Sequence, residues 1–172
     1  MKLAFIGPDM TGKSNIAGEL SHRLEVPVFK NSGEWSTKLD STDYFLNLLR
    51  YGGPFLMDFI SQTNVSVILD RFYPCELIYA DAFERETDMS VISWMDEKFA
   101  AADGKFIICV RKSYHGLVDD QYPDDLPIEM LQKLDRLYRE FAKTTQCDCL
   151  LLETDDFDLD RQISDIMNFL ES

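Results

Sequence analysis

The chain reads Gly7-Pro8-Asp9-Met10-Thr11-Gly12-Lys13-Ser14 close to its N-terminus. The apolar run at residues 3–6 precedes this segment, and residues 14–24 after it carry apolar side chains at helical spacing. A glycine at each end lets the backbone curl so that successive N–H groups point inward, and the helix start adds the positive end of a dipole. The spacing G-x-x-x-x-G-K-[ST] between a strand and a helix therefore predicts a phosphate-binding loop, the P-loop.

The side chains of this loop predict a nucleoside triphosphate and a metal ion as ligands. Lys13 is expected to reach the β- and γ-phosphates of ATP as a point charge, and the Ser14 hydroxyl is suited to bind Mg²⁺. The residues expected to contact the phosphates of ATP are Gly7, Asp9, Met10, Thr11, Gly12, Lys13 and Ser14.

Short apolar runs alternate with amphipathic segments along the rest of the chain. The predicted strands are residues 3–6, 26–29, 65–69, 106–110 and 150–152. The predicted helices are residues 14–24, 44–51, 54–60, 76–83, 90–101, 128–143 and 159–170, with Gly52-Gly53 separating the second from the third. Continuous apolar strands alternating with helices predict an α/β fold of three layers, α/β/α, around a central five-stranded parallel sheet, the P-loop NTPase fold.

Length and composition bound the possible function classes. The 172 residues predict a single domain, and a 45% hydrophobic content supplies a core without disulfides. A net charge of −14 makes extended nucleic acid an unfavourable partner. No apolar run reaches the roughly 20 residues of a membrane span. The four cysteines fit no zinc pattern and predict reduced thiols in a cytoplasmic protein: Cys75, Cys109, Cys147 and Cys149.

The third predicted strand ends in Asp70-Arg71-Phe72. A carboxylate at the C-terminal end of a buried strand beside the P-loop strand faces the ligand crevice of such a sheet. Asp70 is therefore a candidate to hold Mg²⁺ with Ser14, or to accept a hydrogen bond from the acceptor. Arg71 is suited to grip a second phosphate with two hydrogen bonds. A structural salt bridge between Asp70 and Arg71 is the alternative.

These motifs resemble those of the thymidylate kinases. Asp9 inside the loop is similar to that family's G-x-D-x-x-G-K-[ST] pattern, and Asp70-Arg71-Phe72 is similar to its Asp-Arg-Tyr element. Cys75-Glu76-Leu77-Ile78-Tyr79-Ala80 stands where the family has Ser-x-x-Ala-Tyr. The deoxynucleoside kinases carry a comparable carboxylate–arginine pair and are close competitors. The likeness follows the order of elements over most of the chain, and its specific parts are the loop and the Asp-Arg pair.

The resemblance implies an acceptor pocket between the second and third strands and just beyond. A nucleobase is expected to stack among aromatic side chains there, with polar groups reading its edges. The candidate acceptor-binding residues are Asp9, Glu34, Trp35, Phe45, Arg50, Phe55, Arg71, Phe72, Glu76 and Tyr79.

Two positions depart from the family pattern. Asn31 stands where the thymidylate kinases have a glutamate after strand two, and Glu34 is the candidate replacement. The family also supplies a catalytic arginine from the P-loop or from a lid, and the P-loop position here is Met10. Residues 111–127 are the candidate lid, and Arg111 is the candidate for the missing cation, beside Lys13, Asp70 and Arg71 as catalytic residues.

The resemblance and the motifs together predict an ATP- and Mg²⁺-dependent phosphotransferase that phosphorylates a deoxynucleoside monophosphate, most like thymidylate kinase acting on dTMP. A deoxynucleoside kinase, or a kinase of a modified base such as 5-hydroxymethyluracil in DNA, is one alternative. A non-catalytic P-loop nucleotide-binding module is another. A small-molecule nucleotide is the expected partner, membranes are not, and a homodimer is expected from the resemblance alone.

Overall fold

A computed structural model describes residues 1–30, 46–117 and 126–172. Its core is a parallel sheet of five strands in the order β2-β3-β1-β4-β5. The strands are β1 (Lys2–Ile6), β2 (Val28–Lys30), β3 (Val67–Asp70), β4 (Gly104–Val110) and β5 (Asp148–Glu153). The P-loop strand β1 therefore lies in the middle, between β3 and β4, and this arrangement brings the end of β3 beside the start of the P-loop.

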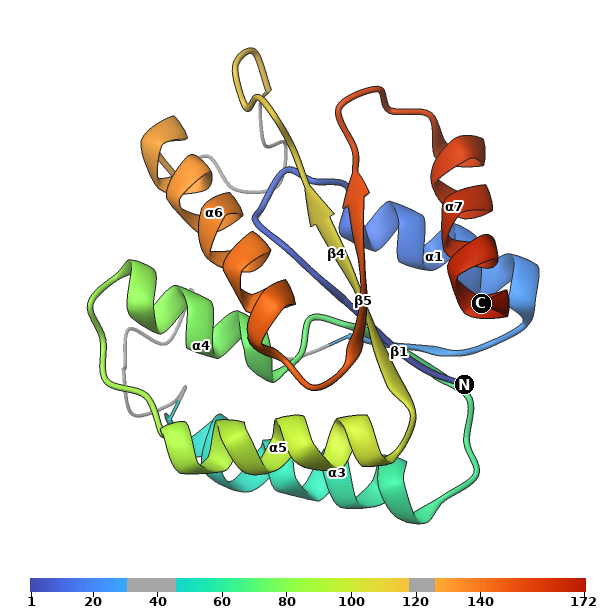
Figure 1. Ribbon diagram of the computed structural model, residues 1–172, viewed down its shortest axis with the longest axis vertical. Coiled ribbons are helices and arrows are strands. Elements are labelled where there is room, and N and C mark those ends of the chain that lie inside the picture. Colours follow the sequence, from blue (N-terminus) through green and yellow to red (C-terminus); the bar gives the residue numbers. More distant parts are fainter. Residues whose placement is uncertain (31–45, 118–125) are drawn as a thin grey trace.

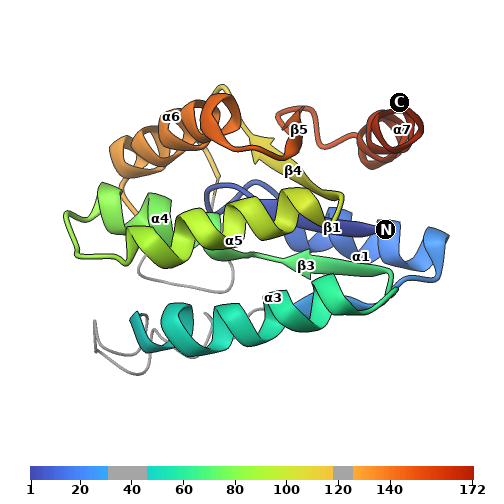
Figure 2. The same cartoon turned by 60° about the horizontal axis from the view of Figure 1, so that its bottom comes forward.

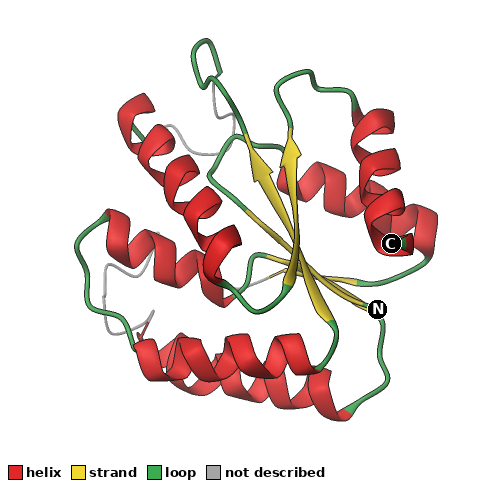
Figure 3. Ribbon diagram, viewed as in Figure 1, coloured by secondary structure: helices red, strands yellow, loops and turns green. Residues whose placement is uncertain are grey.

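Helices cover both faces of the sheet, which confirms the three-layer α/β/α fold. The helical segments are α1 (Lys13–Leu24), η2 (Leu48–Gly52), α3 (Gly53–Gln62), α4 (Tyr73–Ala82), α5 (Met89–Ala101), α6 (Ile128–Thr144) and α7 (Leu159–Glu171). Figures 1 and 3 show α1 and α7 on one side of the strands and α3, α4, α5 and α6 on the other. In Figure 2, α3 lies at the opposite side of the molecule from α6 and β5.

Each central strand supplies apolar side chains to both faces, because successive residues of a strand point in opposite directions. In β1, Ala4 and Ile6 join the cluster beneath α3 to α6, whereas Leu3 and Phe5 join the cluster beneath α1 and α7. This two-sided burial is the reason that the strands read as continuous apolar runs.

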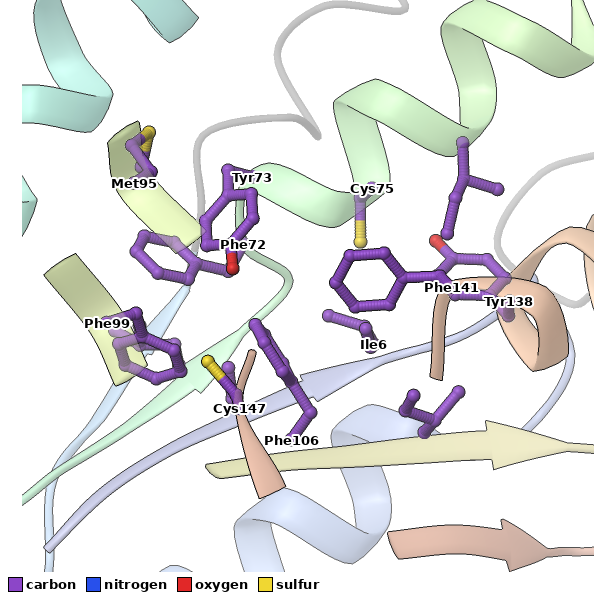
Figure 4. Close-up of a cluster of buried hydrophobic side chains, with 14 of the residues drawn as sticks. Ile6, Phe72, Tyr73, Cys75, Met95, Phe99, Phe106, Tyr138, Phe141 and Cys147 are labelled. Atoms are coloured by element: carbon purple, nitrogen blue, oxygen red, sulfur yellow. The ribbon is translucent and has the colours of Figure 1, made fainter. Parts of the chain in front are cut away.

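The larger cluster is built around aromatic rings, as Figure 4 shows. Phe99 lies between Phe72 and Phe106, with ring centroids 5.1 Å from each, and Tyr73 packs edge-on against Phe106 at 5.8 Å. Phe72 was a candidate to stack a base, but it is 4% exposed and belongs to this core. Phe72 is thus a packing residue, and α4 begins directly after it.

The sequence prediction that Gly52-Gly53 separates two helices is wrong. Both glycines have right-handed helical backbone angles, and the π-helical turn η2 continues directly into α3. A Cβ atom on Gly53 would lie 2.9 Å from the Met95 sulfur of α5, and one on Gly52 would lie 2.9 Å from a Leu48 methyl carbon. Gly53 therefore allows close packing of α3 on α5, and Gly52 leaves room for Leu48 in the preceding turn.

The remaining elements begin and end within a few residues of their predicted bounds. All four cysteines are free thiols, as expected. Burial raises the pKa of the Cys109 thiol to about 12, so it stays protonated. None of the helices among the described residues combines the length and the apolar composition that spanning a bilayer requires. Four predictions concern residues outside the described ranges: Glu34, Trp35, Phe45 and the lid segment 118–125.

Candidate active site

The P-loop joins β1 to α1 through three residues with positive φ: Gly7 at 140°, Met10 at 63° and Gly12 at 76°. Gly7 is required for space as well as for its backbone angle, because a Cβ atom there would lie 2.2 Å from the carbonyl oxygen of Cys109 in β4. Gly12 is the N-cap of α1 and offers no side-chain cap, so the first N–H groups of this helix face the loop. The loop has the curled backbone that phosphate binding needs.

Lys13 folds back over its own loop. Its ammonium donates hydrogen bonds to the carbonyl oxygen of Pro8 and, at 3.3 Å, to the hydroxyl of Thr11. The side chain is buried, and burial together with the nearby Arg71 guanidinium lowers the pKa of Lys13 below its usual value, despite the opposing effect of Asp9. An anion in the loop would stabilise the charged form of Lys13, which is the form a phosphate needs.

Ser14 connects the loop helix to the end of β3. Its hydroxyl donates a 2.7 Å hydrogen bond to Oδ2 of Asp70, and Oδ1 of the same carboxylate is buried with no hydrogen-bond partner among the described residues. A buried carboxylate oxygen without a partner is costly, and a hard cation satisfies it. The pair Ser14 and Asp70 therefore fits Mg²⁺, which prefers oxygen ligands and commonly takes only one or two from the protein, with waters and phosphates completing its shell.

Asp9, Arg71 and Tyr79 form a second polar group at the loop. Arg71 donates to Oδ1 of Asp9 in an ion pair, and the Tyr79 hydroxyl donates to Oδ2 at 2.7 Å. Burial would raise the pKa of Asp9, but Arg71 and Lys13 hold it below its usual value, so the carboxylate is ionised. Burial also raises the pKa of Tyr79, which therefore remains a hydrogen-bond donor at neutral pH.

Arg71 adopts a positive φ of 69°, which is uncommon for a residue with a side chain. Its backbone N–H donates to the carbonyl oxygen of Phe5 at 2.9 Å, so this residue extends the pairing of β3 with β1 before the chain turns. The strained turn directs the guanidinium toward the P-loop rather than along the sheet. Strained residues held in this way are concentrated at binding sites.

Glu76 lies on α4 one turn before Tyr79. Both of its oxygens accept hydrogen bonds from Arg85, at 3.1 and 3.3 Å. Burial raises the pKa of Glu76, and Arg85 offsets part of that rise. Arg85 thus holds both carboxylate oxygens of Glu76, and the role of Glu76 in acceptor binding stays a prediction.

Arg111 follows β4 directly and is 6% exposed. Its guanidinium donates to the carbonyl oxygens of Thr154, at 2.9 Å, and of Asp155, at 3.4 Å, both just beyond β5. The ring of Phe157 lies 4.5 Å from the guanidinium carbon and is otherwise exposed. In the structure Arg111 therefore holds the β5–α7 connection, and its predicted catalytic role stays a prediction.

Asp135 anchors the beginning of the candidate lid. One of its oxygens accepts from the backbone N–H of Arg111 at 2.8 Å and from the Tyr114 hydroxyl at 3.1 Å, and the other accepts from Arg139 at 2.7 Å. The carboxylate of Asp155 accepts from the next two backbone N–H groups, those of Lys112 and Ser113. Residues 111–114 are consequently fixed to the body of the protein, and any lid begins after them.

Two predicted acceptor residues lie apart from the groups around the P-loop. Arg50 makes a 2.7 Å ion pair with Asp88, the N-cap residue of α5. Phe55 is 77% exposed on the outer face of α3. Their roles in acceptor binding stay predictions, and the described part of the chain places neither beside Asp9 or Arg71.

A groove of about 570 Å³ lies elsewhere, between α6 and the edge strand β5. It shares no residue with the polar groups around the P-loop. Its lining residues are Arg136, Arg139, Glu140, Ala142, Lys143, Cys149 and Leu151. The phosphate-binding loop and the pairs Ser14–Asp70 and Asp9–Arg71 make the P-loop, rather than this groove, the candidate active site.

Sequence motifs predicted the P-loop, Asp70 and Arg71, but none predicted the groups that hold Arg111. Thr154, Asp155 and Phe157 gave no motif. The sequence does contain an indication of Asp135, because a charged residue stands there on the apolar face of α6, between Leu134 and Tyr138. A carboxylate in such a place needs hydrogen-bond donors from neighbouring elements.

Comparisons with known proteins agree with this geometry at the level of the fold. No protein-family model matches the chain, and neither does any curated protein. Among solved structures, YorR from Bacillus subtilis in complex with phosphorylated GDP is 22% identical, with a TM-score of 0.67 over 99% of this chain and 96% of that one. Deoxyadenosine kinase from M. mycoides with bound dATP is 18% identical, with a TM-score of 0.59 and complete coverage of both chains. Thymidylate kinase from Ehrlichia chaffeensis is 17% identical, with a TM-score of 0.61 over 100% of this chain and 98% of that one.

These similarities confirm that the chain has the three-layer fold of P-loop kinases around a five-stranded parallel sheet. The resemblance to nucleotide kinases that the P-loop and the Asp70-Arg71 pair predicted is thus confirmed for the fold. The matches extend over nearly the whole of each chain.

Proposed function

We propose that this protein is an ATP-dependent phosphotransferase that phosphorylates a deoxynucleoside monophosphate. The observation that carries the proposal is the placement of two consecutive residues at the end of β3. Asp70 accepts a hydrogen bond from Ser14 at the C-terminal end of the P-loop, and Arg71 pairs with Asp9 in the first half of the loop. Donor and acceptor phosphates would therefore meet between two neighbouring side chains of one strand end.

Different residues of the chain bind the ATP phosphates, the metal ion and the acceptor phosphate during phosphoryl transfer. Lys13 and the N–H groups of the P-loop hold the β- and γ-phosphates, and Ser14 with Asp70 would hold Mg²⁺, which neutralises phosphate charge. Arg71 leaves Asp9 and binds the acceptor phosphate. Asp9 then pairs with another group on the acceptor. An acceptor oxygen then forms a bond to the γ-phosphorus as the bond to the ADP oxygen breaks, and ADP leaves.

Three features are consistent with a nucleotide acceptor. YorR was solved with phosphorylated GDP, and a deoxyadenosine kinase and a thymidylate kinase match the chain, although a shikimate kinase and a gluconokinase match it as well. Tyr79, which contacts Asp9, stacks on Phe83 with ring centroids 6.1 Å apart, so aromatic rings lie beside Asp9. Arg71 provides a fork of donors suited to a phosphate.

Arg111 remains the proposed additional cation for the transferring phosphoryl group. For this role its guanidinium would exchange the carbonyl oxygens of Thr154 and Asp155 for phosphate oxygens when both substrates are bound. The N–H groups of residues 111–113 would stay anchored on Asp135 and Asp155 during that exchange.

A deoxynucleoside kinase is the second candidate, and one observation favours it. The Arg71 charge is already neutralised by Asp9 within the protein, so an acceptor without a phosphate leaves no unpaired cation. The two candidates differ in whether Arg71 must leave Asp9 during the reaction.

The test is a transfer assay with radiolabelled Mg-ATP and a panel of acceptors. The panel holds the deoxynucleosides, their monophosphates and single-stranded DNA containing 5-hydroxymethyluracil. Labelled diphosphate from one monophosphate supports the proposal, and labelled monophosphate supports the second candidate. Lys13→Ala serves as the inactive control, with circular dichroism to show that it folds. If ATP binds but no acceptor becomes labelled under any condition, both kinase proposals are wrong and the protein is a nucleotide-binding module.

A further inference from the structure

The groove between α6 and β5 has an apolar floor. On the β5 side, Cys149 and Leu151 are two residues apart, so their side chains point to the same face of the strand, and Ala142 of α6 adds a third apolar side chain. Because β5 is the last strand of the sheet, no other described strand closes the groove. Its volume of about 570 Å³ is that of a small-molecule site, for which about 300–1,000 Å³ is usual.

The charge of the groove is opposite in sign to that of the chain. Arg136, Arg139 and Lys143 are three and four residues apart, so they lie on one side of α6. Glu140 is the single acidic residue among those that line the groove. Three basic side chains against one acidic give the lining a net charge of +2, whereas the whole chain carries −14. The groove therefore favours an anionic ligand.

Arg139 is held in position at the groove by a buried carboxylate. Its Nε donates a 2.7 Å hydrogen bond to Asp135, which is 6% exposed. Its Nη1 lies 3.7 Å from a Glu153 oxygen, which is too long for a hydrogen bond, and no described residue accepts a hydrogen bond from its two Nη groups. A guanidinium has five N–H donors, so the Nη groups can bind an anion while Nε stays on Asp135. Such preorganisation lowers the entropy cost of binding.

The other two cations of the groove can turn to a ligand at little cost. Arg136 is exposed and has neither a hydrogen bond nor an ion pair with any described residue. Lys143 pairs with Glu140 at 2.7 Å, but the two side chains are 67% and 66% exposed. Ion pairs so exposed contribute little to stability, so an anion in the groove can replace Glu140 as the partner of Lys143.

We propose that this groove binds a small organic phosphate, with the phosphate on Arg136 and Arg139 and the apolar part of the ligand on Ala142, Cys149 and Leu151. Two guanidinium groups match the oxygens of a phosphate, because each offers parallel N–H donors. An extended polyanion such as a nucleic acid would run from the groove onto the acidic remainder of the chain, which repels it. The groove shares no residue with the P-loop, so this inference does not depend on the proposed transfer reaction.

A titration of the ¹⁵N-labelled native chain with phenyl phosphate, followed by NMR, tests the proposal. We expect saturable shifts of the backbone amides of Ala142, Cys149 and Leu151, with a Kd on the order of 1 mM or below. The amides of Gly12 and Lys13 report separately on any binding to the P-loop. Inorganic phosphate should bind the groove at least about threefold more weakly, and phenol should not saturate it. Inorganic phosphate that binds as tightly as phenyl phosphate would overturn the proposal of an organic ligand.

Three substitutions at exposed residues locate the site by the sign of their effect. Arg136→Glu should raise the Kd for phenyl phosphate at least about tenfold, since it places a like charge beside the phosphate. Glu140→Gln should lower that Kd about threefold, because it removes the one acidic group of the lining and frees Lys143. Lys98→Glu, exposed on α5, makes the same change of charge outside the groove and is the control, with an unchanged Kd expected. Shifts confined to the P-loop overturn the proposal, and so does a Kd that Arg136→Glu and Lys98→Glu change equally or that Glu140→Gln raises.

Discussion

The Ser14 hydroxyl donates a 2.7 Å hydrogen bond to Oδ2 of Asp70, while Oδ1 of that carboxylate is buried without a partner in the described part of the chain. One half of the carboxylate is thus satisfied by the protein and the other half is not. An unpaired buried carboxylate oxygen lowers the stability of the metal-free protein, and a bound cation removes that cost. Stability and activity should therefore respond in opposite directions to changes at Asp70.

Asp70→Asn is expected to lower kcat at least about 100-fold, because the neutral amide cannot hold a metal ion beside the transferring phosphate. The free energy of unfolding should stay equal or rise, since the substitution removes a buried charge of nearly the same shape. Steady-state kinetics and urea unfolding measure the two effects. Asp103→Asn, in the exposed turn before β4, is the control and should change neither.

Arg71→Lys should raise the KM for the acceptor about tenfold and leave the KM for ATP nearly unchanged. A lysine keeps the charge but loses the two-pronged contact with a phosphate. Initial-rate kinetics with each substrate varied in turn provide the measurement. Equal changes in both KM values would contradict a role for Arg71 in acceptor binding.

Tyr79→Phe tests how much the Tyr79 hydroxyl contributes to acceptor binding independently of Arg71. It deletes the 2.7 Å hydrogen bond to Asp9 but leaves the Arg71–Asp9 ion pair in place. We expect a smaller rise in acceptor KM than for Arg71→Lys. A larger rise would show that Asp9 and Tyr79, rather than Arg71, dominate acceptor binding.

Arg111→Ala should lower the free energy of unfolding by about 1–3 kcal/mol, because the buried carbonyl oxygen of Thr154 loses its donor. Chemical denaturation measures this loss. If Arg111 also reaches the transferring phosphoryl group, kcat falls with little change in the KM for ATP, measured where the variant is fully folded. An unchanged kcat would confine Arg111 to its contacts with the β5–α7 connection.

Asp88 predicts a specific dependence on pH. Hydrogen bonds from Ser90, Arg50 and the Val91 N–H lower the pKa of Asp88 from 3.8 to about 2. A carboxylate with a depressed pKa stabilises the fold fully above about pH 4 and loses that contribution as the pH falls through about 2. The difference in free energy of unfolding between the native chain and Asp88→Asn should therefore be constant near neutral pH and shrink below pH 4. A constant difference down to pH 2 would contradict this assignment.

The sequence predicted the fold class because its signals were local. Apolar runs such as residues 106–110 and the spacing within α6 report strands and helices directly. Gly52 and Gly53 misled the prediction, because their backbones are helical and the reason for glycine is the neighbouring Met95 and Leu48. Only the tertiary structure shows what a missing side chain makes room for.

Site residues could be predicted where they belong to a sequence motif of fixed spacing. Lys13 and Ser14 belong to one motif, and Asp70 follows from its place at the end of a strand beside the P-loop strand. Tyr79 was expected as a ring that stacks a base, yet in the structure its hydroxyl holds Asp9, a contact across 70 residues. Contacts between residues so distant in sequence depend on how α4 turns after the strained backbone of Arg71.

The central position of β1 also has a consequence for how the chain is made. β1 is synthesised before both of its partners, β3 and β4, and Gly7 lies against the Cys109 backbone of β4. Strands that pair with distant segments wait for those segments to be synthesised. The P-loop is therefore made before the strands that flank β1, and we expect it to take its binding shape only after β4 has been translated. A nascent chain stalled before β4 should bind no ATP.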